Sequence, residues 1–271
     1  FFMNRVAITG VGIVSTLGSG RAKVADSLAR GRSGIRMAAD RAAMGFRSGL
    51  SGVISDFDRP PELPVKQRKT MTDFCMQAHA AALEALSMAG WTAEEVQSHR
   101  TGVIVGNDSS SKACHEQAAI LETEKSTFPI GAGLVFKSLT STVSMNLNVL
   151  LRNRGASWTL SGACASGAHA LGQAADLIAC GRQDRIICGG AQEINWESTC
   201  SFDATNAFST RSSAPEEASR PFDKDRDGLV PSGGAAMVAL ENYEQAVAKG
   251  RDILGEVLAY SFSSDGHSLN V

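Results

Sequence analysis

The chain has 271 residues, of which 43% are hydrophobic and 20% charged, as is typical of a globular protein with a sizeable core. Its net charge of -2 excludes binding to nucleic acid or to an anionic membrane through overall charge. Apolar runs stay shorter than the roughly 18 residues of a membrane-spanning helix. The 6 cysteines form no Cys-x-x-Cys pair, which predicts a reducing, cytoplasmic location.

Apolar runs, glycines and helical periodicity predict the elements of the first half. The helix at 73–89 has the clearest limits, with Asp73 near its beginning and Gly90 as its stop. The other expected features are a buried strand at 6–9 that ends at Gly10, a helix at 24–29, an irregular segment at 36–64 and a strand at 103–105.

The second half continues the same alternation of strands and helices. The expected elements are helices at 115–125 and 134–151, a strand at 158–160, a helix at 168–179, strands at 185–188 and 235–240, a helix at 243–249 and a long strand at 253–262. Strands that alternate with helices predict an α/β fold with a largely parallel sheet.

Cys164 is the strongest candidate for a reactive residue. It lies among small residues, in the sequence SGACASGAH at 161–169, between the expected strand and the expected helix. Small residues permit a tight turn and close approach of a substrate. The positive end of a helix dipole and free backbone N–H groups favour a thiolate and can stabilise an oxyanion. A buried cysteine that packs at the beginning of a core helix is the alternative.

Two other motifs are interpreted as structural. Gly10-Val-Gly12 follows a strand, but Ser15 replaces the third glycine of a dinucleotide fingerprint. The aspartates at 223–227 resemble the start of a calcium loop, but Gly234 stands where a bidentate glutamate is needed. No histidine has the spacing of a metal ligand, so we expect no metal.

Residues 161–169 resemble the nucleophile motif of β-ketoacyl-acyl carrier protein synthases, in the thiolase superfamily. Further segments are similar to the same family, and together they run through nearly the whole chain: RVAITGVGIVS at 5–15, CGGAQE at 188–193, AFSTR at 207–211 and SRPFDKDRDGLV at 219–230. The details are closer to elongating than to initiating synthases.

The resemblance implies a thiolase-like α/β fold, layered αβαβα in the complete enzyme. Residues 1–271 would form the N-terminal ketosynthase domain, the first half of that fold with insertions. Cys164 would be the nucleophile, and the histidines and lysine of the family's chemistry would lie in the second half, absent from this chain. His169, five residues after Cys164, is expected to be a packed or capping residue rather than the catalytic base. No metal or organic cofactor is implied.

The resemblance also places substrate and partner residues. Phe202, Thr205 and Leu229 correspond to positions near the acyl pocket, although core packing alone would explain the phenylalanine and the leucine. The basic cluster of Lys66, Arg68 and Lys69 would dock acyl carrier protein, whose surface is acidic. A plain solvated surface is the alternative for this cluster.

The predicted function is decarboxylative Claisen condensation in fatty acid elongation. An acyl thioester on Cys164 would react with malonyl-acyl carrier protein, and the enzyme would be a homodimer with the strand before Cys164 near the two-fold axis. One alternative is a type II polyketide or aryl-polyene ketosynthase. Another is a catalytically incomplete fragment that acts only in binding or assembly. A non-catalytic chain-length partner is disfavoured, because such subunits usually lack the cysteine.

Overall fold

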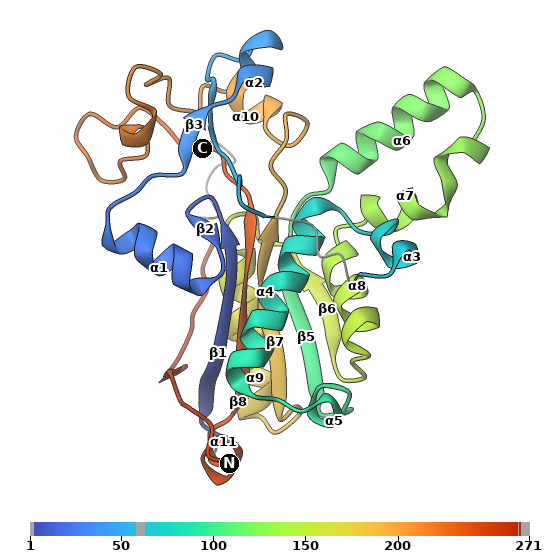
Figure 1. Cartoon of the computed structure of the whole chain (residues 1–271), viewed down its shortest axis with the longest axis vertical. Coiled ribbons are helices and arrows are strands. Elements are labelled where there is room, and N and C mark those ends of the chain that lie inside the picture. Colours follow the sequence, from blue (N-terminus) through green and yellow to red (C-terminus); the bar gives the residue numbers. More distant parts are fainter. Residues whose placement is uncertain (1–2, 58–62, 265, 267–271) are drawn as a thin grey trace.

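The computed structural model describes residues 3–57, 63–264 and 266, and a mixed sheet forms its centre (Figure 1). The order of strands in this sheet is β2-β1-β8-β7-β5-β6, with β9 also paired to β1. These strands are β1 (Val6–Ser15), β2 (Gly18–Ser19), β5 (Thr101–Gly106), β6 (Ser157–Leu160), β7 (Arg185–Gln192), β8 (Gly234–Asn242) and β9 (Gly255–Glu256). A small second sheet pairs β3 (Ile35–Met37) with β4 (Leu50–Gly52).

The expectation of a largely parallel sheet is only partly correct. β5 is parallel to β6 and to β7, but β8 runs antiparallel between β7 and β1. A parallel connection needs a crossover that returns the chain to the other end of the sheet. The segment 193–233 contains only two short helices and stays at the end where β7 finishes, so β8 starts there and runs back (Figure 1).

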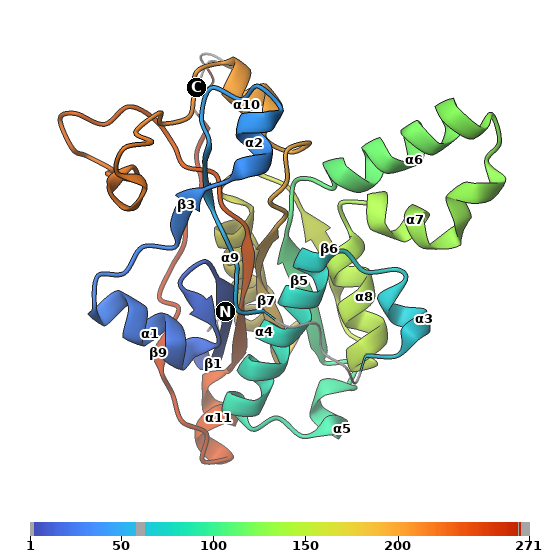
Figure 2. The ribbon, with the colours of Figure 1, turned by 45° about the horizontal axis from the view of Figure 1, so that its top comes forward.

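Helices cover both faces of the sheet. α4 and α8 pack on one face, against β1, β8 and β5, and α9 packs on the other, against β7 and β5 (Figures 1 and 2). The α-helices are α1 (Arg21–Ala29), α2 (Ala39–Ala43), α3 (Val65–Arg68), α4 (Asp73–Ala89), α5 (Ala93–Val96), α6 (Ser111–Glu124), α7 (Gly131–Ser138), α8 (Thr142–Leu151), α9 (Ser166–Ala179), α10 (Cys200–Ala204) and α11 (Tyr243–Ala248). Two 3-10 helices are η1 (Phe128–Ile130) and η2 (Pro215–Glu217).

Each face of the sheet has its own apolar core. The core under α4 and α8 includes Val103, Leu147 and Met237, and the core under α9 includes Ile104, Ile178 and Leu240. Val103 and Ile104 are consecutive in β5 and point to opposite faces, as the two-residue period of a strand requires. Burial on both faces explains why β5 is apolar without alternation.

The limits predicted for the helix at 73–89 are confirmed. The hydroxyl oxygen of Thr72 accepts a hydrogen bond from the Cys75 backbone N–H, and Gly90 ends the helix in the left-handed conformation at φ 64°. A threonine N-cap is a strong local signal for the beginning of a helix, and a glycine after the last turn is one for its end. Such signals act within a few residues, so the sequence alone reveals them.

The expectation that glycines end the first strand is wrong. β1 continues through Gly10 and Gly12 to Ser15. A Cβ at Gly10 would lie 2.0 Å from the Ala85 carbonyl oxygen, and one at Gly12 would lie 1.9 Å from that of Ala81. The two glycines therefore let α4 approach the strand backbone closely, and they do not form a turn.

Three further expectations are corrected. The segment 36–64 was expected to be irregular, but it contains α2, β4 and most of β3. The prolines at 60 and 61 lie outside the described residues. The expected helix at 134–151 is two helices, because Leu139 is extended and α8 starts at Thr142. The expected strand at 253–262 is reduced to the two residues of β9, since only Ala7 and Ile8 of β1 pair with it.

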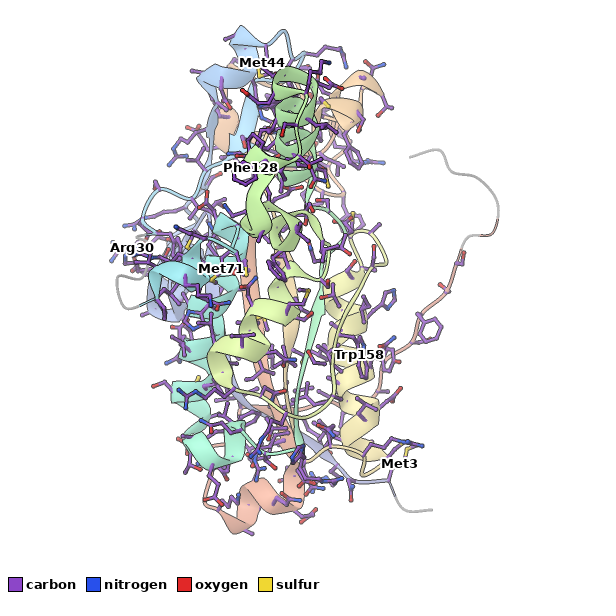
Figure 3. The ribbon with its side chains drawn as sticks, turned by 90° about the vertical axis from the view of Figure 1, so that its right-hand side faces the viewer. Met3, Arg30, Met44, Met71, Phe128 and Trp158 are labelled. Carbon is purple, nitrogen blue, oxygen red and sulfur yellow. The ribbon has the colours of Figure 1, made fainter. Side chains whose placement is uncertain are left out.

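α6 and α7 form an arm that projects from the body of the molecule (Figure 2). Phe128, in η1 between them, is almost fully exposed (Figure 3). Within the described part of the chain, no single helix meets the length and hydropathy needed to cross a membrane. The segments Phe128–Ser138 and Thr142–Leu151 meet them only as a pair, bent by 87°.

Candidate active site

A tight turn between β6 and α9 holds Cys164. Ala163, the residue before it, has a φ of 50°, which is unfavourable for a residue with a Cβ. Ser166 fixes the turn, since its hydroxyl accepts a hydrogen bond from Gly162 N at 2.8 Å and donates one to Ala163 O at 2.6 Å. Cys164 is exposed and precedes the first turn of α9. Strained backbone next to a nucleophile is a recurring feature of strand-to-helix turns in enzymes.

Three glycines let the beginning of α9 lie directly on the sheet. A Cβ at Gly106, at the end of β5, would lie 2.2 Å from the Ser166 carbonyl carbon. Gly190 of β7 faces Gly167 of α9, and a Cβ on Gly190 would lie 3.2 Å from the Gly167 Cα. The close approach places Cys164 above the carboxyl ends of β5 and β7, where α/β sheets commonly bind ligands.

Cys164 opens into a cavity of about 580 Å³, called here the Cys164 cavity. Phe202, Phe208 and Leu229 supply apolar wall, and Asn107 and Thr199 supply polar groups. Cavities of a few hundred Å³ with apolar walls and a few polar groups are typical of small-molecule sites. The cavity can therefore hold an apolar chain attached to the Cys164 sulfur.

The structure brings together two of the three residues predicted to contact substrate. Phe202 and Leu229 both line the Cys164 cavity. Thr205 does not belong to the cavity wall, because it lies past the end of α10 with its hydroxyl hydrogen-bonded to Phe202 O at 2.9 Å. It is exposed to solvent.

The loop that carries Leu229 is held by Asp227. The Asp227 carboxylate accepts hydrogen bonds from the Ser209 hydroxyl at 2.7 Å, from Thr210 N at 3.0 Å and from the Arg220 guanidinium at 3.0 Å. The Ser209 hydrogen bond is the main reason why the pKa of Asp227 is lowered. These contacts hold Leu229 beside Phe208, so Asp227 braces the wall of the Cys164 cavity.

A second cavity, of about 790 Å³, lies beside the first and is called here the basic groove. Arg68 and Lys69 line it, as do Lys112 of α6 and Lys137 of α7. Lys66 is exposed but lies outside the lining. None of these four lining cations forms an ion pair within the described residues, although acidic side chains such as Glu116 share the groove. Gln192 and Glu193 line both cavities.

The described residues offer no metal site, since no group of three or more His, Cys, Asp or Glu side chains is placed to hold an ion. They also place no histidine or lysine in the wall of the Cys164 cavity. The His169 ring lies against Gly162 and packs edge-to-face on Phe262, with the ring centroids 5.9 Å apart. His169 is thus a packed residue, as the sequence predicted. His267 lies outside the described residues.

Several residues of the two cavities were not singled out from the sequence. The fold brings Thr199 and Phe208 to the Cys164 cavity, and it brings Lys112 and Lys137 to the basic groove beside it. Glu193 was partly indicated by the sequence, because it is the last residue of the segment CGGAQE at 188–193, which resembles the family. It accepts hydrogen bonds from Ser111 N at 2.6 Å and from the Asn195 amide at 2.8 Å, and so it ties the beginning of α6 to the end of β7.

The family model described as beta-ketoacyl synthase, N-terminal domain, matches residues 3–246. The chain belongs to the beta-ketoacyl synthase family. It is 36% identical over 271 residues to 3-oxoacyl-[acyl-carrier-protein] synthase 1 of Haemophilus influenzae, a match that covers 98% of this chain and 66% of that protein. It is also 36% identical over 267 residues to the enzyme of the same name from Escherichia coli, with 97% and 66% covered. The chain thus spans about two thirds of the length of these curated relatives.

Solved structures agree with this family membership. A beta-ketoacyl synthase from Burkholderia phymatum superposes with a TM-score of 0.91 at 32% identity, over 98% of this chain and 66% of that one. The ishigamide ketosynthase/chain length factor gives a TM-score of 0.87 at 27% identity, over 98% and 65%. A type II PKS acyl-carrier protein in complex with its ketosynthase gives 0.85 at 25%, over 98% and 64%. The fold is the thiolase-like α/β fold of the ketosynthases.

Proposed function

We propose that this chain carries the nucleophile of a β-ketoacyl-acyl carrier protein synthase that elongates fatty acids, and that Cys164 is this nucleophile. The observation that carries the proposal is the exposed Cys164 at the beginning of α9, facing a cavity with an apolar wall. Relatives named 3-oxoacyl-[acyl-carrier-protein] synthase support it. Residues 1–271 act as the N-terminal ketosynthase domain.

The first half of the reaction loads the enzyme. The Cys164 thiolate attacks the carbonyl carbon of an acyl thioester on acyl carrier protein or CoA. A tetrahedral oxyanion forms, and the Cys164 backbone N–H at the beginning of α9 donates to it. Collapse of this intermediate releases the carrier thiol and leaves the acyl group as a thioester on Cys164. The acyl chain then lies along Phe202, Phe208 and Leu229.

The second half forms the carbon–carbon bond. Malonyl-acyl carrier protein loses CO2, and the electrons of the broken bond leave an enolate on the carrier thioester. The enolate carbon attacks the acyl carbonyl on Cys164, and the C–S bond breaks as the thiolate leaves. The product is a β-ketoacyl chain longer by two carbons. Histidines of the family's second half would stabilise the enolate, and no metal or organic cofactor takes part.

Three features support the proposed partners and location. The cluster Lys66, Arg68 and Lys69, beside the basic groove, suits the acidic surface of acyl carrier protein. Among the described residues β6 pairs only with β5 and so forms an edge of the sheet, which suits pairing with a second copy in a homodimer. All six cysteines are free, as expected in the cytoplasm.

A type II polyketide ketosynthase is the second candidate. Two neighbours, the ishigamide ketosynthase/chain length factor and the ketosynthase in complex with a type II PKS acyl-carrier protein, favour it. The chemistry on Cys164 would be the same and the extended chain would differ. Product identification with fatty acid and polyketide carrier proteins separates the two functions.

Acylation measured by intact-protein mass spectrometry tests the proposal. We expect incubation with acyl-acyl carrier protein to add one acyl group, and peptide mapping to place it on Cys164. The Cys164→Ala variant should take up none, whereas Cys180→Ala should react normally, because Cys180 lies exposed at the other end of α9. Acylation that persists in Cys164→Ala would refute the assignment. A protein that is never acylated would favour the catalytically incomplete assembly module.

A further inference from the structure

Arg41 stands between the two cavities. It lies in α2, is only 2% exposed and lines the basic groove. Its Nη2 donates a hydrogen bond to the Thr199 hydroxyl oxygen at 2.8 Å, and Thr199 lines the Cys164 cavity. The guanidinium is therefore one side chain behind the cavity that would hold an acyl group.

The other end of this guanidinium is unsatisfied. Arg41 Nη1 is buried and has no hydrogen-bond acceptor among the described residues. Asp40 and Asp203 are the nearby carboxylates, and the Asp203 oxygens already accept from Arg47 N at 2.8 Å and from Ser48 N at 3.0 Å. A buried donor without an acceptor destabilises the fold, and such a group calls for an explanation. A ligand that supplies the acceptor is one explanation.

The guanidinium is also held in one orientation. The Thr199 hydroxyl donates to Asn195 O at 2.8 Å, so its oxygen is free to accept from Arg41. The guanidinium carbon lies 5.0 Å from the ring centroid of Phe46 and 5.8 Å from that of Phe208. A fixed arginine loses little freedom when a ligand binds, which is the property of a recognition group rather than of a solvated charge.

We propose that Arg41 binds a carboxylate at the far end of the acyl chain carried by Cys164, so that this chain accepts acyl groups that end in a second carboxylate. The inference rests on the proposed function of Cys164. Carboxylate is the chemical class that suits the position, because a charged acceptor compensates a buried guanidinium better than a neutral one. Phe202, Phe208 and Leu229 line the Cys164 cavity along the apolar middle of the chain. Thr199 belongs to the same wall, and Arg41 lies directly behind it, at the end of the chain.

Acylation of the full chain by paired thioesters tests this assignment. Each pair has the same length, and one member ends in a methyl group and the other in a carboxylate. We expect Arg41→Met to lower the rate of acylation with the carboxylate member by about tenfold and to leave the methyl member unchanged or faster. Arg36→Met, which removes an exposed arginine of β3 outside both cavities, is the matched control and should keep the preference of the unmodified protein. A thermal unfolding curve verifies that Arg41→Met is folded at the assay temperature. A lower Tm is expected, because the variant loses the hydrogen bond to Thr199 and leaves the Asp203 carboxylate without its nearby cation.

The outcomes separate this inference from the proposed function. Normal acylation with methyl-ended thioesters, together with the same ratio of rates in the unmodified protein and in Arg41→Met, would overturn the carboxylate assignment alone. No acylation by any thioester would overturn the function of Cys164. In that case calorimetry with free linear dicarboxylates decides: weaker binding by Arg41→Met than by Arg36→Met supports the subsite, and equal binding rejects it.

Discussion

At the scale of single residues, the conformation of Ala163 determines where the Cys164 sulfur lies. Its φ of 50° carries a steric cost for any residue with a Cβ. The Ser166 hydroxyl bonds at both ends of the turn and holds it against that cost. The strain is therefore maintained by neighbouring contacts, and its effect is to present the sulfur to the Cys164 cavity.

Replacing Ala163 by glycine should stabilise the fold and at the same time slow the acylation of Cys164. Glycine adopts a positive φ without strain, so Ala163→Gly should raise the free energy of unfolding by up to about 1 kcal/mol. A more mobile turn positions the sulfur less well, and acylation of Cys164 should slow several-fold. Urea unfolding and the acylation rate measure the two effects. Ala165→Gly is the control, because φ is −85° there and glycine should cost about 0.5–1 kcal/mol. Equal losses of stability in both variants would contradict the strain argument.

At the scale of elements, the contact between β1 and α4 depends on glycine. Gly10 and Gly12 face the α4 carbonyl oxygens of Ala85 and Ala81 at distances that leave no room for a methyl group. The helix consequently lies close to the strand, and its alanines at 78, 81, 82 and 85 are almost completely buried. Close packing of small residues here fixes the height of α4 above the sheet.

Gly12→Ala should therefore destabilise the fold by more than an ordinary glycine substitution in a strand. The added methyl group would overlap a backbone carbonyl 1.9 Å away, so the helix must move. We expect a loss of about 3 kcal/mol or more in the free energy of unfolding, measured by chemical denaturation. Gly255→Ala, in β9, is the matched control, since its nearest neighbour is Ile8 Cδ1 at 4.0 Å. A loss no larger for Gly12→Ala than for this control would show that α4 can shift freely.

Elements whose limits are set by neighbouring residues could be predicted from the sequence, and elements that depend on distant contacts could not. The helix from Asp73 to Ala89 was predicted with correct limits, because its cap and its terminal glycine are local signals. Gly10 and Gly12 were misjudged, because their role comes from a helix more than 60 residues away. The segment 253–262 has the composition of a strand, but pairing is limited to β9, and Leu258 is 85% exposed. A strand needs a partner, and composition does not supply one.

The residues of the candidate site also divide into those that the sequence predicts and those that only the fold brings together. Cys164, Phe202 and Leu229 were predicted, since the family resemblance places Cys164 as the nucleophile and the other two near the acyl pocket, and the structure places all three in one cavity. Arg41 could not be predicted as a site residue. Its guanidinium is buried against Thr199 and Phe208, which lie far along the chain, and this packing leaves its Nη1 without an acceptor among the described residues.

At the scale of the whole molecule, an ion network ties the end of the sheet opposite Cys164 to the chain that follows β8. Glu241, fully buried in β8, accepts from Arg185 Nε at 2.9 Å. Glu95 of α5 accepts from Arg251 at 2.6 Å and from Lys249. Burial alone would raise the pKa of Glu95, but the hydrogen bonds from Lys249, the Thr92 backbone and Arg251 outweigh it and lower the pKa from 4.5 to about 2.

This network predicts a loss of stability in acid. The folded state holds Glu95 ionised to a lower pH than the unfolded state does, so its contribution is complete above pH 4.5 and disappears as the pH falls toward 2. The shift corresponds to about 3 kcal/mol. Urea unfolding across that range should show the unmodified protein losing about this much more than Glu95→Gln. Parallel stability curves for the two proteins would assign the acid sensitivity to other groups.

The basic surface around α3 allows a test of the proposed docking of acyl carrier protein. Lys66, Arg68 and Lys69 lie near Lys112 and Lys137 of the projecting arm, on the side of the molecule opposite α1 (Figure 1). Clustered cations attract an acidic partner over about 10 Å at low ionic strength, and salt screens that attraction. Lys69→Glu should therefore weaken binding of acyl carrier protein by roughly tenfold at low salt, with a much smaller effect at high salt.

Arg21→Glu is the matched control for this charge reversal, because Arg21 is equally exposed but begins α1. It changes the net charge by the same amount and should leave carrier binding nearly unchanged. Fluorescence anisotropy with labelled acyl carrier protein at two salt concentrations gives both affinities. If both variants weaken binding equally, the effect is one of net charge and not of a docking site. If neither does, acyl carrier protein docks on another part of the surface.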